Sequence, residues 1–450
     1  MIWSKYNYMY ESRRHNCFFL YNSRTNSFIK LSEDIYNELS IVKDKEDFDW
    51  DSANINANSL RNLIKAKVII DPFEDENFII QKKMVRYMHG FQRSTLGIVL
   101  LPTFACNFRC TYCYESDLPR YFMSEITENK VIEFIKSFEN CSNLQLCWHG
   151  GEPLIAFENV KRFLSKIERD DLIKITHHSM VSNGYLLDRE KCVYLSDHKL
   201  DSIQITIDGL KENHDKSRIH KLGFSTFDTI INNIENVFQL MPKCHVIIRM
   251  NVHAENEADF PLLYEYLKSK WGNQNYSINM KYANDHNNGC RVECFKDRDK
   301  IFYAKKLYDN YKIENIGFYP KPKIGGCAAT YINTFVIDPK GYIYKCWVDV
   351  GKPERRIGNI SEKKFNAALM SEYIMGTDMF SDPKCLDCLL LPICDGGCNL
   401  RRLDYKLKKI PYDVCPIDIE NLDILFDMFY EQQLKTKMDQ LENIEINPMV

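Results

Sequence analysis

The sequence has no stretch of eighteen or more apolar residues, the length that a membrane-spanning helix needs. Its N-terminus, MIWSKYNYMYESRR, lacks the basic segment followed by an apolar segment that marks a secretory signal. The formal net charge is −3 over 450 residues, so the strong basic excess typical of nucleic-acid-binding proteins is also missing. We therefore expect a soluble, cytoplasmic protein that binds neither membranes nor nucleic acids.

Cysteine, in contrast, is abundant, with 17 in the chain. In a reducing cytosol this number does not fit a disulfide framework, whereas metal or iron–sulfur ligation explains it. A chain of this length is expected to form about two to four domains, each with its own core.

The densest cysteine motif is Cys106-Asn-Phe-Arg-Cys110-Thr-Tyr-Cys113, with the spacing C-x3-C-x2-C. Three thiolates on one short loop can hold three irons of a [4Fe–4S] cluster and leave the fourth iron open to a small molecule. The alternative is a zinc loop, which needs a fourth ligand nearby, and the sequence shows no obvious one. The motif therefore favours a cluster with an open iron.

Residues 1–92 are expected to form a small α+β module. Segments 17–22 (CFFLYN) and 27–31 (SFIKL) resemble paired strands joined by a turn. Ser32 is expected to begin a helix that reaches about Val42, and a second helix begins at Ser59 and leads into a strand at 68–71. This order predicts a winged-helix fold. The alternative is a structural extension without a binding role.

Residues 93–310 alternate between strand and helix patterns. Helical segments follow Ser124, with Val131 and Ile135 on one face, and recur near 156–169, 188–198, 226–240 and 258–270. Six consecutive βα units predict an α/β fold with a parallel sheet, either a partial (β/α)6 barrel or a doubly wound sheet. Its ligand should lie beyond the carboxyl ends of the strands. The strand candidates are 97–101, 144–148, 173–182, 202–207, 245–252 and 277–283.

Two motifs follow this rule. The cysteine loop comes after the first strand, and His149-Gly150-Gly151-Glu152-Pro153 comes after the second. Two glycines let a backbone approach a ligand closely, and the Glu152 carboxylate can accept a hydrogen bond from an ammonium group. Alone this segment could be an ordinary turn. Placed on the strand next to the cysteine loop, it becomes a specific indication of a ligand site.

Together these motifs resemble those of radical S-adenosylmethionine enzymes. The resemblance implies that Cys106, Cys110 and Cys113 bind a [4Fe–4S] cluster and that the methionine part of S-adenosylmethionine chelates its open iron. It also implies that the Gly150-Gly151-Glu152 turn holds the methionine amine. Reductive cleavage of the cofactor would give a 5′-deoxyadenosyl radical that abstracts a hydrogen from the substrate. Tyr112 matches the aromatic residue before the third cysteine and is predicted to contact the cofactor.

Further strand-end residues resemble positions that line the methionine and ribose parts of the cofactor in this family. For each of them ordinary loop capping is an alternative. His149 is expected to be structural, and Arg249 and Asn251 are candidates to face the same cavity. The predicted cofactor-binding residues at these strand ends are Ser182, Asn183, Thr206 and Asp208.

Seven further cysteines resemble the SPASM extension, which houses auxiliary [4Fe–4S] clusters. They are Cys327, Cys346, Cys385, Cys388, Cys394, Cys398 and Cys415. The resemblance implies an outer cluster on Cys385, Cys388, Cys394 and Cys415 and an inner cluster on Cys327, Cys346 and Cys398. Residues 311–420 are therefore expected to form a loop-rich SPASM domain, followed by a C-terminal helix within 421–450. The chain as a whole is expected to hold three clusters.

The inner cluster has three predicted cysteine ligands. Some relatives carry another cysteine where this chain has Asn333. The cluster either recruits an outside ligand, with Cys290 and Cys294 as candidates, or keeps an open iron. An open iron could bind a substrate cysteine thiolate, which remains a hypothesis.

A front module ahead of radical and SPASM domains resembles the element that binds leader peptides of ribosomally made, modified peptides. Its binding mode would add the leader as a strand to a sheet edge. We therefore expect a peptide maturase that forms an intramolecular cross-link, most simply a cysteine thioether, with a carbon–carbon or ether link as alternative. A flavodoxin, ferredoxin or other reductase would supply electrons under oxygen-poor conditions. No catalytic base is predicted.

The sequence disfavours two alternative functions. An anaerobic sulfatase maturase, which makes formylglycine, usually lacks the front module and carries an acidic base where this chain has Trp347, with Asp349 two residues further on. An electron carrier or peptide-binding protein would leave the Gly150-Gly151-Glu152 turn unexplained.

Overall fold

The computed structural model describes residues 1–45, 48–169, 174–283, 292–295, 297–314, 322–323, 325–362, 364–410, 415 and 419–440. The chain forms two compact units. The barrel unit contains Phe91–Lys296 and Ala328–Ile374. The flanking unit contains Met1–Gly90, Asp297–Cys327 and Met375–Val450.

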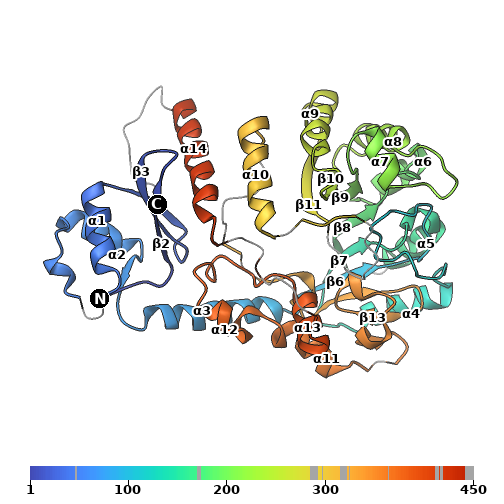
Figure 1. Ribbon diagram of the computed structural model, residues 1–450. Coiled ribbons are helices and arrows are strands. Elements are labelled where there is room, and N and C mark those ends of the chain that lie inside the picture. Colours follow the sequence, from blue (N-terminus) through green and yellow to red (C-terminus); the bar gives the residue numbers. More distant parts are fainter. Residues whose placement is uncertain are drawn as a thin grey trace. The chain divides into compact units, whose positions relative to one another are not determined.

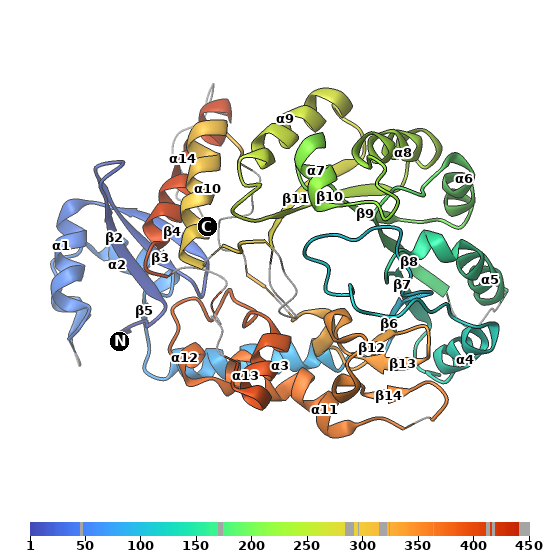
Figure 2. The ribbon, with the colours of Figure 1, turned by 45° about the vertical axis from the view of Figure 1, so that its right-hand side comes forward.

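The barrel unit is built on one sheet with the strand order β11-β10-β9-β8-β7-β6-β12-β13-β14. Strands β6 to β11 are parallel, and each lies beside its predecessor in the sequence. Figures 1 and 2 show these strands in a curved row with the connecting helices on the outer side. The predicted partial α/β barrel is confirmed. The six strands are β6 (Thr95–Leu100), β7 (Asn143–Trp148), β8 (Lys174–Ser182), β9 (Ser202–Thr206), β10 (His245–Val252) and β11 (Tyr276–Tyr282).

The helices predicted in the barrel unit begin and end close to the expected positions, whereas the short helices at 211–217 and 367–371 were not predicted. Helix α4 starts after Ser124, whose hydroxyl accepts a hydrogen bond from Thr127 N at 3.1 Å, and it buries Val131 and Ile135 against the sheet. No helix in the described part of the chain is long and apolar enough to span a membrane. The helices are α4 (Glu125–Lys136), α5 (Phe157–Ile167), α6 (Arg189–Asp197), α7 (Lys211–Ser217), α8 (Phe227–Leu240), α9 (Asp259–Trp271) and α11 (Ala367–Ser371).

The sheet continues into a part of the chain that was expected to be loop-rich. Strand β12 (Thr334–Ile337) pairs in parallel with β6, and β13 (Tyr342–Tyr344) and β14 (Gly358–Asn359) follow as antiparallel neighbours. Phe335 on β12 is 1% exposed and stacks on Phe365. Residues 328–374 of the expected SPASM domain therefore belong to the barrel unit, because these strands extend its sheet.

The flanking unit contains a three-stranded antiparallel sheet with the order β2-β3-β4 and a separate short pair of β1 with β5. The central strand β3 is buried on both faces, since Phe19, Leu20 and Tyr21 are all 0% exposed. Leu20 contacts a core formed with α1 and α2, whereas Phe19 and Tyr21 contact α10 and α14. Figure 2 shows these helices on the two sides of the sheet. The elements are β1 (Ile2–Trp3), β2 (Asn7–Ser12), β3 (Cys17–Asn22), β4 (Ser27–Leu31), β5 (Ile69–Ile70), α1 (Glu33–Val42), α2 (Ala57–Lys65), α10 (Asp297–Tyr311) and α14 (Leu422–Gln440).

Helix α3 (Glu74–Gly90) was not predicted, and it joins the front module to the auxiliary cysteine segments within this unit. Arg86 donates to the carbonyl oxygen of Gly325 at 2.8 Å, and the Tyr87 hydroxyl donates to the Asp378 carboxylate at 2.6 Å. The expected front module and the cysteine-rich C-terminal part thus share one compact unit. That part contains α12 (Pro383–Leu386) and α13 (Asn399–Lys408).

Candidate functional site

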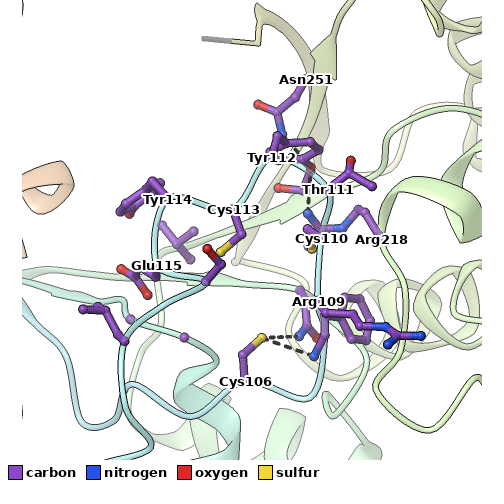
Figure 3. A pocket seen from close by; sticks show the side chains of 18 of the residues that line it. Cys106, Arg109, Cys110, Thr111, Tyr112, Cys113, Tyr114, Glu115, Arg218 and Asn251 are labelled. Atoms are coloured by element: carbon purple, nitrogen blue, oxygen red, sulfur yellow. Dashed lines mark hydrogen bonds between the residues drawn. The ribbon is translucent and has the colours of Figure 1, made fainter. Parts of the chain in front are cut away.

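The barrel unit contains a cavity of about 880 Å³ at the carboxyl ends of its parallel strands. Its wall includes the loop after β6 and the turn after β7, together with the ends of β8, β9 and β10. This volume falls within the usual range for small-molecule sites. Figure 3 shows Cys106, Cys110 and Cys113 on one loop around this hollow. The three predicted ligands of the radical cluster are therefore brought together.

The cysteine loop is held in place by its own backbone. Arg109 N donates to Ile219 O at 2.8 Å, and Thr111 N donates to Ser217 O at 3.1 Å. In the opposite direction, Lys221 N donates to Asn107 O at 2.8 Å. These bonds pair the loop with the chain that follows α7, so the spacing of the three cysteines is fixed by a short backbone ladder.

Tyr112 anchors the loop from its side chain. Its hydroxyl donates to the Asp208 carboxylate and accepts hydrogen bonds from Arg218 Nη1 and Asn251 Nδ2, both at 3.0 Å. Asp208 is 0% exposed and also accepts from Asn251 N at 2.9 Å. Figure 3 shows Tyr112 beside Asn251 and Arg218. The Tyr112 hydroxyl is thus bonded to the end of β9, to β10 and to the segment after α7.

The chemistry of the three thiols fits a cluster. Burial raises the pKa of Cys106 and that of Cys113 to about 12, and burial also raises the pKa of Cys110. Bare thiols here stay protonated near neutral pH, and bound iron would supply the positive charge that stabilises thiolates. No three His, Cys, Asp or Glu side chains in the described ranges converge to hold a single metal ion. A [4Fe–4S] cluster does not need such convergence, because each cysteine binds a different iron.

The two glycines after β7 are required by contacts within the chain. A Cβ on Gly151 would lie 2.4 Å from Ala105 O and 2.6 Å from Phe104 O. Gly150 has φ +119°, and its Cβ would lie 2.5 Å from Thr103 O. The turn therefore packs directly on the backbone that leads into the cysteine loop, with Glu152 N donating to Ala105 O at 2.9 Å.

Glu152 connects this turn to the end of β8. Its carboxylate accepts from Leu154 N at 3.0 Å, from the Ser182 hydroxyl at 2.9 Å and from Asn183 N at 2.7 Å. Glu152 is 0% exposed, and burial raises its pKa. The carboxylate fixes the two strand ends relative to each other.

The other predicted cofactor residues fall into two groups. Tyr112, Gly150, Gly151, Ser182, Asn183 and Thr206 line the cavity. Glu152 and Asp208 lie behind the wall, fully buried, and bond to residues that form it. Their roles toward S-adenosylmethionine stay predictions. Arg249 and Asn251 line the same cavity, as their positions on the fifth strand suggested.

The cavity wall also contains residues that the sequence did not single out. Glu115 lies two residues after Cys113, and burial raises its pKa to about 7. Its Oε1 is 3.9 Å from Nδ1 of His149, whose ring stacks on Trp347 at 5.3 Å between centroids. Burial and the charge of Arg249 lower the pKa of His149 to about 4, so this imidazole is neutral. The only feature of the sequence that could have indicated Glu115 is its acidic side chain so close to the cysteine motif.

Four of the predicted auxiliary cysteines share one cavity in the flanking unit. Cys385, Cys388, Cys394 and Cys415 line one mostly apolar cavity, together with Met379, Leu390, Leu391, Gly396, Arg402 and Ile419. This is the set predicted for the outer cluster. Four thiols in one pocket fit the four irons of a cubane cluster.

The inner set is divided between the units. Cys327 and Cys398 belong to the flanking unit and Cys346 to the barrel unit. Cys294 is described and its thiol lies 3.9 Å from Val292 O, whereas Cys290 lies outside the described residues. The ligand set of the inner cluster stays a prediction.

Comparison with known proteins agrees with this geometry. The family model described as the radical SAM superfamily matches residues 100–267. A cysteine-type anaerobic sulfatase-maturating enzyme of Clostridium novyi is 24% identical over 340 residues, covering 68% of this chain and 88% of that protein. The radical SAM cyclopropyl synthase TigE of Paramaledivibacter caminithermalis is 25% identical over 299 residues, covering 53% of this chain and 59% of that protein.

Two solved structures share the fold. AnSMEcpe with bound AdoMet has a TM-score of 0.61 and 20% identity, covering 76% of this chain and 99% of its own. Streptococcus suis SuiB bound to the precursor peptide SuiA has a TM-score of 0.52 and 16% identity, covering 93% of this chain and 99% of its own. Fold, cysteine loop and sequence relationship agree: residues 100–267 form a radical SAM domain, and the chain is a radical SAM enzyme that is similar to maturases and a cyclase.

Proposed function

We propose that this enzyme matures a ribosomally made precursor peptide by forming an intramolecular cross-link, most simply a cysteine thioether. The observation that carries the proposal is the single cavity that the C-x3-C-x2-C loop and the Gly150-Gly151 turn share. When bound there, the cluster and S-adenosylmethionine supply a 5′-deoxyadenosyl radical that takes a hydrogen atom from the substrate. Cys106, Cys110 and Cys113 would hold the cluster, and the strand ends of β7, β8 and β9 would hold the cofactor.

The chain's own residues have a positioning role in this reaction. Backbone pairing and the Tyr112 anchor fix the cysteine loop, and Glu152 fixes the turn beside it. The auxiliary cysteines would hold two further clusters, and a flavodoxin, ferredoxin or other reductase would supply the electron that starts the reaction.

A peptide substrate is supported by the flanking unit. Its sheet has two edge strands, β2 and β4, to which an extended leader peptide could add a strand. SuiB, solved with its precursor peptide, matches the fold over 93% of this chain, whereas anSMEcpe matches 76%. The longer match favours the peptide-maturase interpretation.

The sulfatase-maturase alternative has support in sequence, through the relative from Clostridium novyi. The structure around Trp347, the residue after Cys346, does not place an acidic catalytic base at the cavity. Trp347 and Val348 line the cavity there, whereas Asp349 is 0% exposed and its carboxylate accepts a hydrogen bond from the Tyr373 hydroxyl. Asp349 is thus engaged inside the protein rather than at the cavity wall. We therefore rank formylglycine formation second.

The test is anaerobic co-expression with a candidate cysteine-containing precursor, followed by mass spectrometry. A cross-link removes two hydrogen atoms and blocks alkylation of the linked cysteine. Formylglycine instead replaces the cysteine sulfur with an aldehyde oxygen, and that product would move the alternative to first place. Replacing Cys106, Cys110 and Cys113 by alanine is the matched control, and continued modification by that variant would refute the radical mechanism.

The leader-binding role has its own measurement. Hydrogen exchange of the full chain should slow at one edge strand, β2 or β4, when the leader peptide is added. The exchange of the central strand β3 should stay unchanged, because it is already paired on both sides. Unaltered exchange at both edges, with a leader that binds, would contradict strand addition.

A further inference from the structure

The pocket formed by the four outer-cluster cysteines contains a buried arginine. Arg402 lies on α13, one turn after Cys398, and is 8% exposed. Its guanidinium donates from Nη2 to Cys385 Sγ at 3.0 Å, from Nη1 to Asp382 Oδ2 at 2.9 Å and from Nε to Gly396 O at 2.7 Å. The side chain is therefore fixed by three contacts, one of them to a predicted cluster ligand.

The other described sulfur contacts in this pocket come from backbone amides. Leu390 N lies 3.4 Å from Cys388 Sγ, and Gly396 N lies 3.2 Å from Cys394 Sγ. Hydrogen bonds of this kind stabilise thiolate charge and tune iron–sulfur clusters. Among the described contacts, Arg402 is the donor with a full positive charge, and charge-assisted hydrogen bonds are roughly twice as strong as neutral ones.

The charges around Arg402 suit this arrangement. Nη1 of the guanidinium forms an ion pair with Asp382, while Nη2 donates to the cysteine sulfur. The arginine thus places a fixed positive charge directly beside one sulfur of the four-cysteine pocket.

We propose that Arg402 is a positioning residue for the outer auxiliary cluster, holding Cys385 and raising the cluster's reduction potential. One-electron reduction adds one negative charge to the cluster and its thiolates. A fixed cation at one of the sulfurs stabilises the reduced form more than the oxidised form, so the potential rises. The inference rests on the proposed cluster at Cys385, Cys388, Cys394 and Cys415.

A raised potential would make this cluster an electron acceptor. In the proposed cross-linking step a carbon radical and a cysteine thiolate join in a carbon–sulfur bond and release one electron. The thiol proton goes to solvent before the bond forms, and the outer cluster is a site where the electron can be stored, directly or through the inner cluster. The same arginine therefore suits an oxidant role.

The experiment uses the full chain with Cys106, Cys110 and Cys113 replaced by alanine, so that only auxiliary clusters contribute. Arg402→Met, Arg402→Lys and Arg401→Met are made in this background and reconstituted anaerobically. Iron content is measured, and midpoint potentials are determined by a redox titration followed by electron paramagnetic resonance. Arg401 is the matched control, because it is the preceding residue on the same helix and is less buried.

We expect Arg402→Met to move one auxiliary couple to a more negative potential and to leave the other unchanged. Arg402→Lys keeps the positive charge but cannot form all three hydrogen bonds of the guanidinium. We expect it to retain its iron and to shift the midpoint potential of the same couple in the same direction by a smaller amount. Arg401→Met should move neither couple. If Arg402→Met loses iron, the midpoint potentials of Arg402→Lys are used for the test. Unchanged potentials in Arg402→Lys would then overturn the inference.

Failure of this inference can be told from failure of the proposed function. One outcome is that the chain that lacks the three radical-cluster cysteines shows auxiliary redox couples whose midpoint potentials Arg402→Met does not change, with full iron content. That result refutes only the role of Arg402. If the background chain binds no iron–sulfur cluster at all, the auxiliary clusters of the proposed function are refuted together with it.

Discussion

The hydroxyl of Tyr112 donates a hydrogen bond to the buried carboxylate of Asp208, which joins the cysteine loop to the end of β9. Arg218 and Asn251 donate to the same hydroxyl, so one phenol oxygen links three parts of the barrel unit to the loop. Tyr112 lies between Cys110 and Cys113 in the sequence, so this hydrogen bond helps to fix the positions of two predicted cluster ligands.

Replacing Tyr112 by Phe should weaken this anchor. Asp208 loses a donor, and Arg218 and Asn251 lose an acceptor inside the protein, which costs about 1–3 kcal/mol. We expect lower iron occupancy after reconstitution and slower formation of 5′-deoxyadenosine. Tyr121→Phe, at a ring that is 40% exposed, should change neither quantity. Equal iron content and cleavage rate in both variants would show that the hydroxyl does not anchor the cluster loop.

Replacing Gly151 by Ala should separate the turn from the cysteine loop. The added methyl would lie 2.4 Å from Ala105 O, closer than real contacts allow, so the backbone must move. Overpacking of this kind costs about 1–3 kcal/mol. Anaerobic equilibrium dialysis should show weaker binding of S-adenosylmethionine.

Gly97→Ala is the matched control for that variant. Its methyl would meet the Thr334 side chain at 3.0 Å, and a side chain can rotate away where a carbonyl cannot. A cofactor affinity that falls equally in both variants would contradict the argument from close backbone packing.

The barrel could be predicted because short sequence segments show its strands and helices without knowledge of their tertiary contacts. Each of the strands β6 to β10 has a strand pattern in the sequence and is followed by a helix, and Ser124 marks the start of α4 as an N-cap should. The cysteine loop was found from spacing alone. Tyr112 was singled out by resemblance, but its partners Asp208, Arg218 and Asn251 could be combined into one network only once the strands were placed side by side.

Other features left no local signal. Helix α3 buries the charged Asp75 and Arg86, and its Phe78 and Ile79 are only partly buried against an apolar cluster, so no continuous apolar stripe marks it. The strands β12, β13 and β14 are two to four residues long, which is too short for alternation to be visible. The shared core of the front module and α14 was indicated only by the uninterrupted apolar run at β3, which hinted at a strand buried on both faces.

Deleting residues 1–90 should therefore do more than remove leader binding. Tyr21 contacts Phe426 of α14 and Phe19 contacts Tyr430 of the same helix. Arg86 donates a hydrogen bond to Gly325 O, close to Cys327, and Lys82 donates one to Pro392 O, close to Cys394. The deletion exposes this core, and we expect loss of outer-cluster iron and aggregation of the flanking unit. Iron content and size-exclusion chromatography measure both effects. A truncated chain that stays monomeric with full auxiliary iron would show that the module is an independent domain.

Acid should destabilise the barrel unit through His149. Its Nδ1 accepts a hydrogen bond from Gly150 N at 2.6 Å, and burial and the charge of Arg249 lower its pKa from 6.5 to about 4. Between these values the unfolded chain binds a proton that the folded chain does not. The stabilisation is therefore complete above pH 6.5 and is lost as the pH falls toward 4, by on the order of 1–3 kcal/mol in total.

His149→Gln tests this dependence because its amide does not titrate in that range. The free energy of unfolding, measured by denaturant titration at a series of pH values, should fall less steeply with acid in the variant than in the natural protein. Both proteins have the same cysteines and the same His214, whose pKa is lowered by burial to about 3, so these contributions cancel in the comparison. Parallel slopes for the two proteins would mean that His149 is not the group whose protonation opposes folding.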